Sequence, residues 1–158
     1  MTPIFDRLFP ARADNNTYRG STLALWVFGL LVLVRSAIGL GSIFNGHAAA
    51  SSADGIPLDT FTPAGAQTVL ALFGLLGVSQ VVFSVLCIVV LVRYRALIPL
   101  MFALLLLYQL SRKLILYFLP IPRTGAPPVS AINLAILGLM IVGLALSLRS
   151  QAGLRSPP

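Results

Sequence analysis

Four apolar stretches, each long enough to cross a lipid bilayer, constrain this sequence more than any other feature. An α-helix rises about 1.5 Å per residue, so about 20 apolar residues cross the roughly 30 Å hydrocarbon core of a membrane. In a chain of 158 residues, four such stretches leave room for one membrane domain and no soluble module. The predicted spans are residues 22–44, 64–92, 96–119 and 129–148.

The composition supports the same class of protein. Hydrophobic residues make up 58% of the chain, charged residues make up 9%, and the mean hydropathy is +0.95. These values are typical of an integral membrane protein. We therefore predict an all-α membrane protein with a single domain, residues 21–149, in which four transmembrane helices form an antiparallel bundle. The net charge of +7 does not indicate nucleic-acid binding, because the basic residues are scattered singly and in pairs, mostly at span ends.

The arginines outside the spans predict how the bundle is oriented. Basic residues are enriched on the cytoplasmic side of membrane proteins. With both termini cytoplasmic, only Arg123 lies outside, and the arginines on the inner side are Arg7, Arg12, Arg19, Arg93, Arg95, Arg149 and Arg155. Residues 1–20 and 150–158 are then a cytoplasmic arm and tail, and 45–63, which contains no Lys or Arg, is an outer loop. We expect a multi-pass protein of the bacterial inner membrane.

Polar and cationic side chains inside two of the spans are the unusual feature of the sequence. Arg35 interrupts the first span, and Gln109, Arg112 and Lys113 lie well inside the third. A Lys or Arg at the centre of a span costs on the order of 3 kcal/mol and is a candidate functional residue by default. Arg35 also argues against reading the first stretch as a secretory signal peptide, since a signal peptide has a shorter and uninterrupted apolar region.

Two interpretations of these side chains are open. In the first, they form an outward-facing pocket for an anionic lipid headgroup, a small anion or a quinone, with two loop carboxylates as counter-ions when the pocket is empty. The predicted ligand-binding residues are Arg35, Gln109, Arg112 and Lys113, and the predicted counter-ions are Asp54 and Asp59. In the second, Arg35 pairs with protein groups, while Arg112 and Lys113 reach lipid phosphates with their long side chains.

Small and polar residues predict where the helices pack against one another. Gly39 and Ser42 follow Arg35 on one face of the first span, and Gly74, Gly77 and Gln80 lie along the second. Small residues let two helix backbones approach closely in a membrane, and an amide can hydrogen-bond across the contact. We expect these five residues to contribute to helix packing.

The residues that catalysis and metal binding require are scarce. The chain contains no glutamate, one cysteine (Cys87) and one histidine (His47), and none of its aspartates lies within a span. A zinc set, bis-histidine haem ligation and proton-relay carboxylates therefore have no support. We assign no catalytic residue, metal or cofactor and expect a binding role. The alternative, a membrane enzyme, would have to use His47 together with Asp54 or Asp59 in the outer loop.

Two segments carry a family resemblance. The first span contains an Arg followed by small residues (VRSAIGLGSIFNG), and the third contains QLSRK. With four spans in about 150 residues, this pattern resembles the DoxX-like group of small bacterial membrane proteins. The Lys that commonly closes the first span in that group is replaced here by Asn45-Gly46-His47. The resemblance implies an alternative role as an accessory subunit that docks onto a larger membrane complex, an oxidoreductase or a transporter, and it assigns no site residues.

Overall fold

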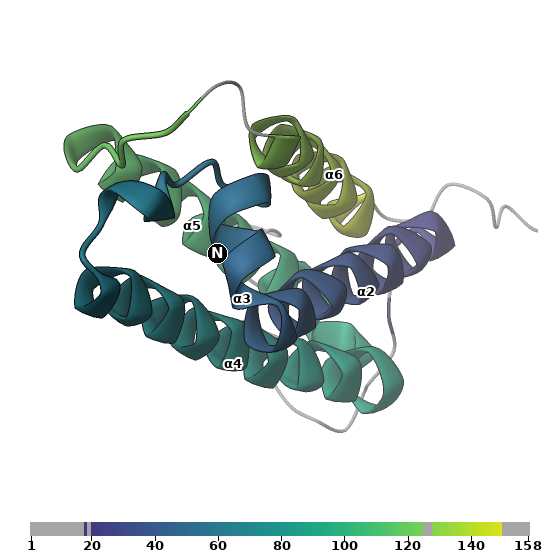
Figure 1. Ribbon diagram of the computed structural model, residues 1–158. Coiled ribbons are helices and arrows are strands. Elements are labelled where there is room, and N and C mark those ends of the chain that lie inside the picture. Colours follow the sequence, from purple (N-terminus) through teal and green to yellow (C-terminus); the bar gives the residue numbers. More distant parts are fainter. Residues whose placement is uncertain (1–17, 19, 125–127, 150–158) are drawn as a thin grey trace, which may run out of the picture.

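The computed structural model describes residue 18, residues 20–124 and residues 128–149, and this part of the chain contains helices and no strands (Figure 1). The four long helices are α2 (Thr22–Phe44), α4 (Pro63–Arg93), α5 (Ile98–Phe118) and α6 (Pro128–Leu148). All four are long and apolar enough to cross a membrane. The predicted all-α, four-span fold is therefore confirmed, and the span boundaries differ from the predicted ones by no more than two residues.

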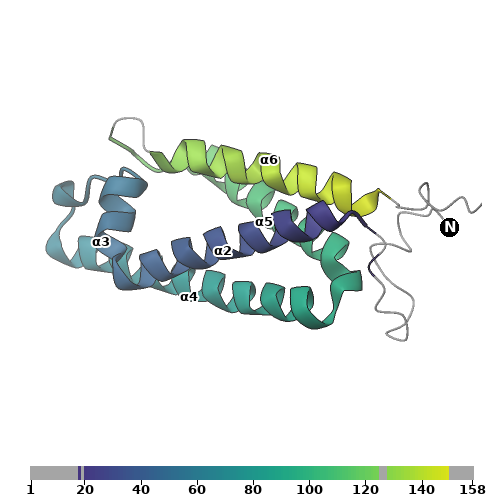
Figure 2. The same ribbon diagram turned by 90° about the vertical axis from the view of Figure 1, so that its right-hand side faces the viewer.

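Consecutive long helices run antiparallel along the bundle (Figure 2). The two ends of the bundle differ in the connections that they carry. One end, which we call the terminal end, carries the start of α2, the end of α6 and the short turn η3 (Arg95–Leu97) between α4 and α5. Here the Ser21 amide donates to the Leu146 carbonyl at 3.3 Å. The cytoplasmic location of this end stays a prediction. The predicted arm at 1–20, apart from residues 18 and 20, and the tail at 150–158 lie outside the described residues.

Local sequence explains where the long helices begin. Ser21 caps α2, because its side chain accepts a hydrogen bond from the Leu23 amide. Thr62 caps α4 by accepting from the Gly65 amide, and Pro63 occupies the first helical position, where a missing N–H is not needed. These caps determine where α2 and α4 begin, and these two helices form the most extensive packing contact of the bundle.

The terminal half of the bundle has a closely packed apolar core. Phe28 of α2 and Phe102 of α5 are fully buried, and their rings meet edge to face with centroids 5.1 Å apart. Gly143 of α6 lies against Phe102 so closely that a Cβ at this position would run into the ring. The neighbouring core residues, all at most 1% exposed, are Ala24, Leu31, Ile98, Leu105 and Met140.

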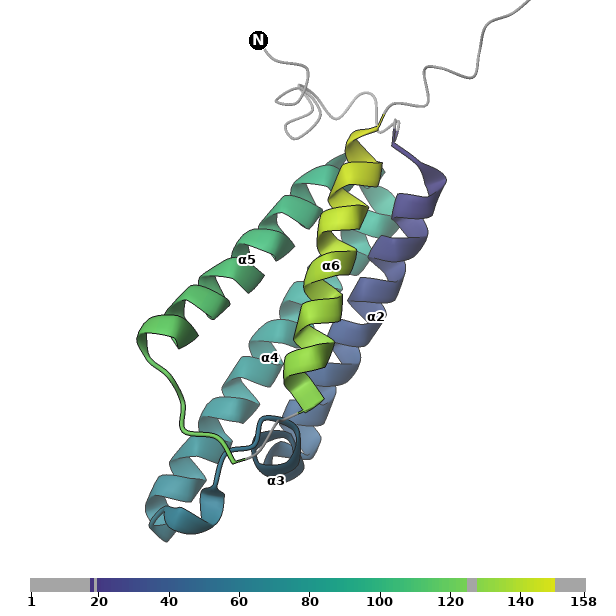
Figure 3. The ribbon, with the colours of Figure 1, turned by 90° about the horizontal axis from the view of Figure 1, so that it is seen from above.

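The other end of the bundle, the loop end, is covered by two connections that fold back over it (Figure 3). The first contains α3 (Gly46–Ala48) and the helical turns η1 (Ala49–Ala53) and η2 (Leu58–Thr60). Its apolar residues pack on α4, with Ala50, Ile56 and Leu58 buried. The second connection is tied to the first, because the Thr124 amide donates to the Gly55 carbonyl at 2.8 Å. We call residues 49–56 and 121–124 together the roof.

The packing predicted from small residues is realised at some positions and not at others. Gly39 of α2 faces Gly77 of α4. A Cβ added at Gly77 would lie 2.7 Å from the Gly39 carbonyl oxygen and 3.1 Å from the Ser42 Cβ. Gly74, by contrast, has no atom of the described chain within 4 Å of the position of its missing Cβ. On α4, Gly74 is about 60° from Gly77 around the axis, and only Gly77 faces α2.

Candidate functional site

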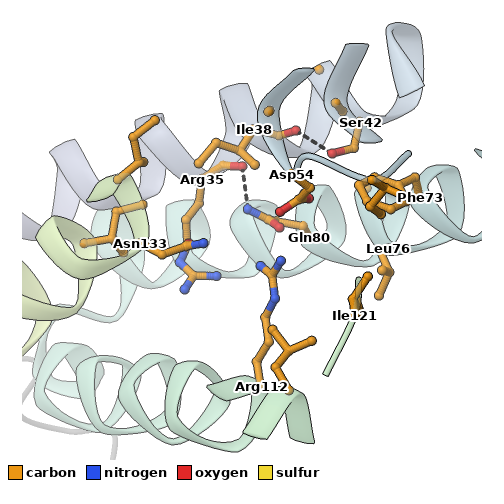
Figure 4. A pocket seen from close by; sticks show the side chains of 18 of the residues that line it. Arg35, Ile38, Ser42, Asp54, Phe73, Leu76, Gln80, Arg112, Ile121 and Asn133 are labelled. Carbon is orange, nitrogen blue, oxygen red and sulfur yellow. Dashed lines mark hydrogen bonds between the residues drawn. The ribbon is translucent and has the colours of Figure 1, made fainter. Parts of the chain in front are cut away.

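A cavity of about 730 Å³ lies in the loop-end half, bordered by α2, α4, α5, α6 and the roof (Figure 4). Its volume is within the usual range for small-molecule sites. Most of its wall is apolar, formed by side chains such as Phe73, Leu76, Ile115 and Ile136. The polar part of the wall consists of a small number of side chains, and these include most of the intramembrane polar residues singled out from the sequence.

Arg35 lies on the α2 side of the cavity and is only 6% exposed. Its Nη2 donates to Oε1 of Gln109 on α5 at 2.9 Å, and the guanidinium carbon lies 5.4 Å from the centre of the Tyr108 ring. The Gln109 Nε2 in turn donates to Oδ1 of Asn133 on α6 at 3.5 Å. The Gln80 side chain donates to the Arg35 backbone carbonyl at 3.1 Å. The four long helices are thus connected through one polar cluster.

The Arg35 side chain is held in place but not fully satisfied. Its Nε is buried and has no hydrogen-bond partner among the described residues. Leaving a buried donor unpaired costs about 1–3 kcal/mol, and more when the group is charged. Because Gln109 is neutral, it supplies a hydrogen bond to Arg35 without compensating its charge. The positive charge of the buried Arg35 is therefore not compensated by its hydrogen-bond partner.

Arg112 projects into the same cavity from α5, on the side opposite Arg35 (Figure 4). Its guanidinium group points toward Gln80 of α4 and Asp54 of the roof in this view. Two guanidinium groups from different helices therefore face one cavity. Each guanidinium presents a planar fork of N–H donors that matches a carboxylate or phosphate.

Among the described residues, Asp54 supplies the one carboxylate that lines the cavity. It is 8% exposed, and its Oδ1 lies 4.0 Å from Nη2 of Arg123 without accepting a hydrogen bond. Burial raises the pKa of the Asp54 carboxyl, and the nearby Arg112 and Arg123 lower it by a smaller amount, so that the net shift is upward. The charge of Asp54 is thus incompletely compensated where it lies.

Two of the predicted site residues lie elsewhere. Lys113 is exposed and does not line the cavity, because adjacent residues on a helix point about 100° apart and Arg112 takes the inward direction. Asp59 is exposed in η2, away from the cavity wall. Of the predicted set, the cavity brings together Arg35, Gln109, Arg112 and Asp54, and Lys113 and Asp59 lie outside it.

Further polar residues of the cavity wall were not in the predicted ligand-binding set, among them Gln80, Tyr108 and Asn133. Gln80 was assigned to helix packing, and Tyr108 carries no signal that separates it from an ordinary span aromatic. Asn133 has a recognisable signal, because an amide inside an apolar span generally needs a partner in another helix. Its depth matches that of Gln109, which it contacts.

The histidine and the cysteine of the chain lie away from the cavity. His47 is exposed and does not line it, and Cys87 is buried in the packed half. In the described part of the chain, no three His, Cys, Asp or Glu side chains come together to hold a metal ion. Gly39 and Gly77 lie in the contact between α2 and α4, and Gly77 also lines the cavity.

Comparisons with protein-family models, with curated proteins and with solved structures returned no match to this chain. The resemblance to the DoxX-like group therefore stays a prediction. What the fold establishes is a multi-pass membrane protein with four candidate spans.

Proposed function

We propose that this integral membrane protein binds an amphiphile with an acidic head group in the cavity, and that it does so without catalysing a reaction on it. The observation that carries the proposal is that two guanidinium groups, those of Arg35 and Arg112, line one cavity, where the printed hydrogen-bond partner of the Arg35 side chain is the neutral Gln109. A phosphate or carboxylate group supplies the missing negative charge and offers acceptors to both guanidinium groups.

The charge of the cavity favours an anion over a neutral quinone. The charged residues that line it are Arg35, Arg112, Arg123 and Asp54, three positive and one negative, which gives a formal charge of +2. A quinone carbonyl can accept hydrogen bonds but leaves this charge uncompensated in a region of low dielectric. An acidic head group compensates it. The apolar side chains that form most of the wall are suited to a hydrocarbon portion of the same molecule.

The experiment is a comparison of lipid retention by native mass spectrometry of the purified protein. The probes are phosphatidylglycerol and phosphatidylcholine with identical acyl chains, so that only the head group differs, anionic in the first and zwitterionic in the second. We expect the wild-type protein to retain phosphatidylglycerol preferentially and Arg112→Gln to weaken its binding by about tenfold, equivalent to about 1.4 kcal/mol.

Lys113→Gln is the matched control, because it removes the same charge from the same helix one residue away, at an exposed site outside the cavity. It should leave phosphatidylglycerol retention within about twofold of wild type. Equal retention of the two lipids, or equal losses in the two variants, would contradict the proposal. Displacement of the lipid by a quinone of matched chain length, with no dependence on Arg112, would instead assign the cavity to a quinone.

A further inference from the structure

The cavity has an apolar side opening toward the membrane. Toward the loop end, α5 leans away from α4 and α6 (Figures 1 and 3), and α4 and α5 pack only loosely against each other. Leu76 of α4 and Ile115 of α5 line the cavity, yet each is 58% exposed. Residues that line a cavity and are also exposed lie where it opens, and these two are more exposed than Ile121 of the roof, at 44%, and Ile132 of α6, at 47%. Because both residues lie on candidate spans, this mouth faces acyl chains rather than water.

The roof restricts the way in from the aqueous side. Ala53, Asp54, Ile121 and Arg123 line the cavity from above, and they belong to the two connections that are joined by hydrogen bonds. Both the amide and the hydroxyl of Thr124 donate to the Gly55 carbonyl, at 2.8 and 3.2 Å. The packing of Ile56 on α4 further anchors the first connection. A ligand that comes from water has to pass this cover, whereas one that lies in the membrane has the apolar mouth in front of it.

We propose that the ligand is a membrane phospholipid with an acidic head group, which enters sideways between α4 and α5, leaving an acyl chain between Leu76 and Ile115 while its head group reaches Arg112 and Arg35. This inference rests on the proposed function and adds to it the class of ligand and its route. The charge of the cavity selects the head group, and the apolar mouth between two spans accommodates the chain. A free phosphate ion uses only the polar half of this arrangement.

The test places a fluorescent reporter in the mouth. The chain has a single tryptophan, Trp26, so that Leu76→Trp in a Trp26→Phe background gives one reporter at the mouth. The protein is reconstituted in phosphatidylcholine vesicles with a minor fraction of phosphatidylglycerol. Bromine atoms, which quench tryptophan on contact, are carried on the acyl chains of one lipid or the other. We expect phosphatidylglycerol to be enriched about tenfold around this reporter relative to its bulk fraction.

Matched reporters one residue away supply the control. Leu75→Trp lies at nearly the same depth of α4, at a position 65% exposed that does not line the cavity, and should report the bulk lipid ratio. On α5, Ile115→Trp and Leu114→Trp form a second pair with the same expectation, which keeps the test decisive if one variant fails to fold. Adding Arg112→Gln should abolish the enrichment at the mouth and leave the controls unchanged.

The outcomes separate this inference from the function on which it rests. If native mass spectrometry shows selective retention of phosphatidylglycerol but the two mouth reporters show only the bulk lipid ratio, the sideways entry is wrong and the acidic-ligand site stands. If inorganic phosphate or glycerol phosphate alone binds with Arg112-dependent affinity and no phospholipid is enriched, the ligand is a small anion. If neither assay shows any preference for the acidic head group, both proposals fail.

Discussion

The two halves of the bundle are built from the same four helices but are packed in opposite ways. In the terminal half, Phe28 and Phe102 fill the space between the helices, and Gly143 makes room for the Phe102 ring. In the loop-end half, a cavity of about 730 Å³ remains, and a buried nitrogen of Arg35 and a buried oxygen of Asp54 have no hydrogen-bond partner. The same chain thus achieves close packing at one end and forgoes it at the other.

The difference separates a closely packed half from the half in which we propose the binding site. Buried polar groups in proteins are nearly always paired, so two unpaired ones beside one cavity call for a specific explanation. Features that disagree with otherwise consistent packing tend to occur at functional sites. The terminal half holds the helices together, which allows the loop-end half to keep polar groups positioned around an open space.

The largest effect is expected from removing the aromatic contact of the terminal half. Phe102→Ala deletes a fully buried ring that touches Phe28 and fills the space beside Gly143, and should lower the free energy of unfolding by about 3–5 kcal/mol. Phe118→Ala, at a position 70% exposed on the same helix, is the control and should cost far less. Unfolding in mixed micelles with increasing denaturing detergent measures both. Similar losses in the two variants would remove the distinction between a packed half and an open one.

A pair of glycines tests the same comparison with effects of opposite sign. Gly143→Ala forces a methyl group against Phe102 and should destabilise the protein by about 1–3 kcal/mol. Gly41 lines the cavity and has nothing within 4 Å of the position of a Cβ, so Gly41→Ala should be neutral or stabilise by up to about 1 kcal/mol. Thermal denaturation of the two variants in one detergent compares them directly. A loss at Gly41 as large as that at Gly143 would mean that the loop-end half is also closely packed.

The smallest effect, a dependence on pH, sharpens the description of the open half. The pKa of the Asp54 carboxyl is raised in the folded protein. The protonated carboxyl therefore stabilises the folded state, and this contribution to the free energy of unfolding is lost as the pH rises through the folded pKa. When ionised, Asp54 faces Arg112 and Arg123, whose attraction offsets only part of the cost of burial. Asp54→Asn should therefore be more stable than wild type at pH 7, by roughly 1 kcal/mol or less.

The advantage of Asp54→Asn should shrink on acidification, because the wild-type carboxyl then becomes neutral as well. The difference in melting temperature between the two proteins, measured from pH 4 to pH 8, tests this sign. A variant that loses stability at pH 7 would show that the ion pair with the arginines outweighs burial.

The spans could be predicted because hydropathy acts residue by residue along the chain. A run of about 20 apolar residues can be recognised as a span without knowing which other segments pack against it. The four predicted spans match α2, α4, α5 and α6 closely. Arg35 could be singled out for the same reason, since a cation in such a run is costly wherever the helix packs. Its partner Gln109 was in the predicted set, but the contact between them needed the packing of α2 against α5.

Choices between neighbouring residues could not be made from the sequence. Arg112 and Lys113 are both cationic and adjacent, and only the rotation of α5 in the bundle turns Arg112 inward. Gly74 and Gly77 are likewise the same residue type on one helix, and only Gly77 lies where α4 crosses α2. Asp54 and Asp59 share one loop, and the way in which that loop folds onto α4 buries the first and exposes the second.

The sequence by itself determined that this chain crosses a membrane four times and carries positive charge within the crossing segments, because transfer into a bilayer depends on the composition of each segment alone. Only the tertiary structure decided that the charge surrounds a cavity, which residues face it and where it opens. Those properties depend on the rotation and tilt of each helix, and these are set by contacts between residues far apart in the chain.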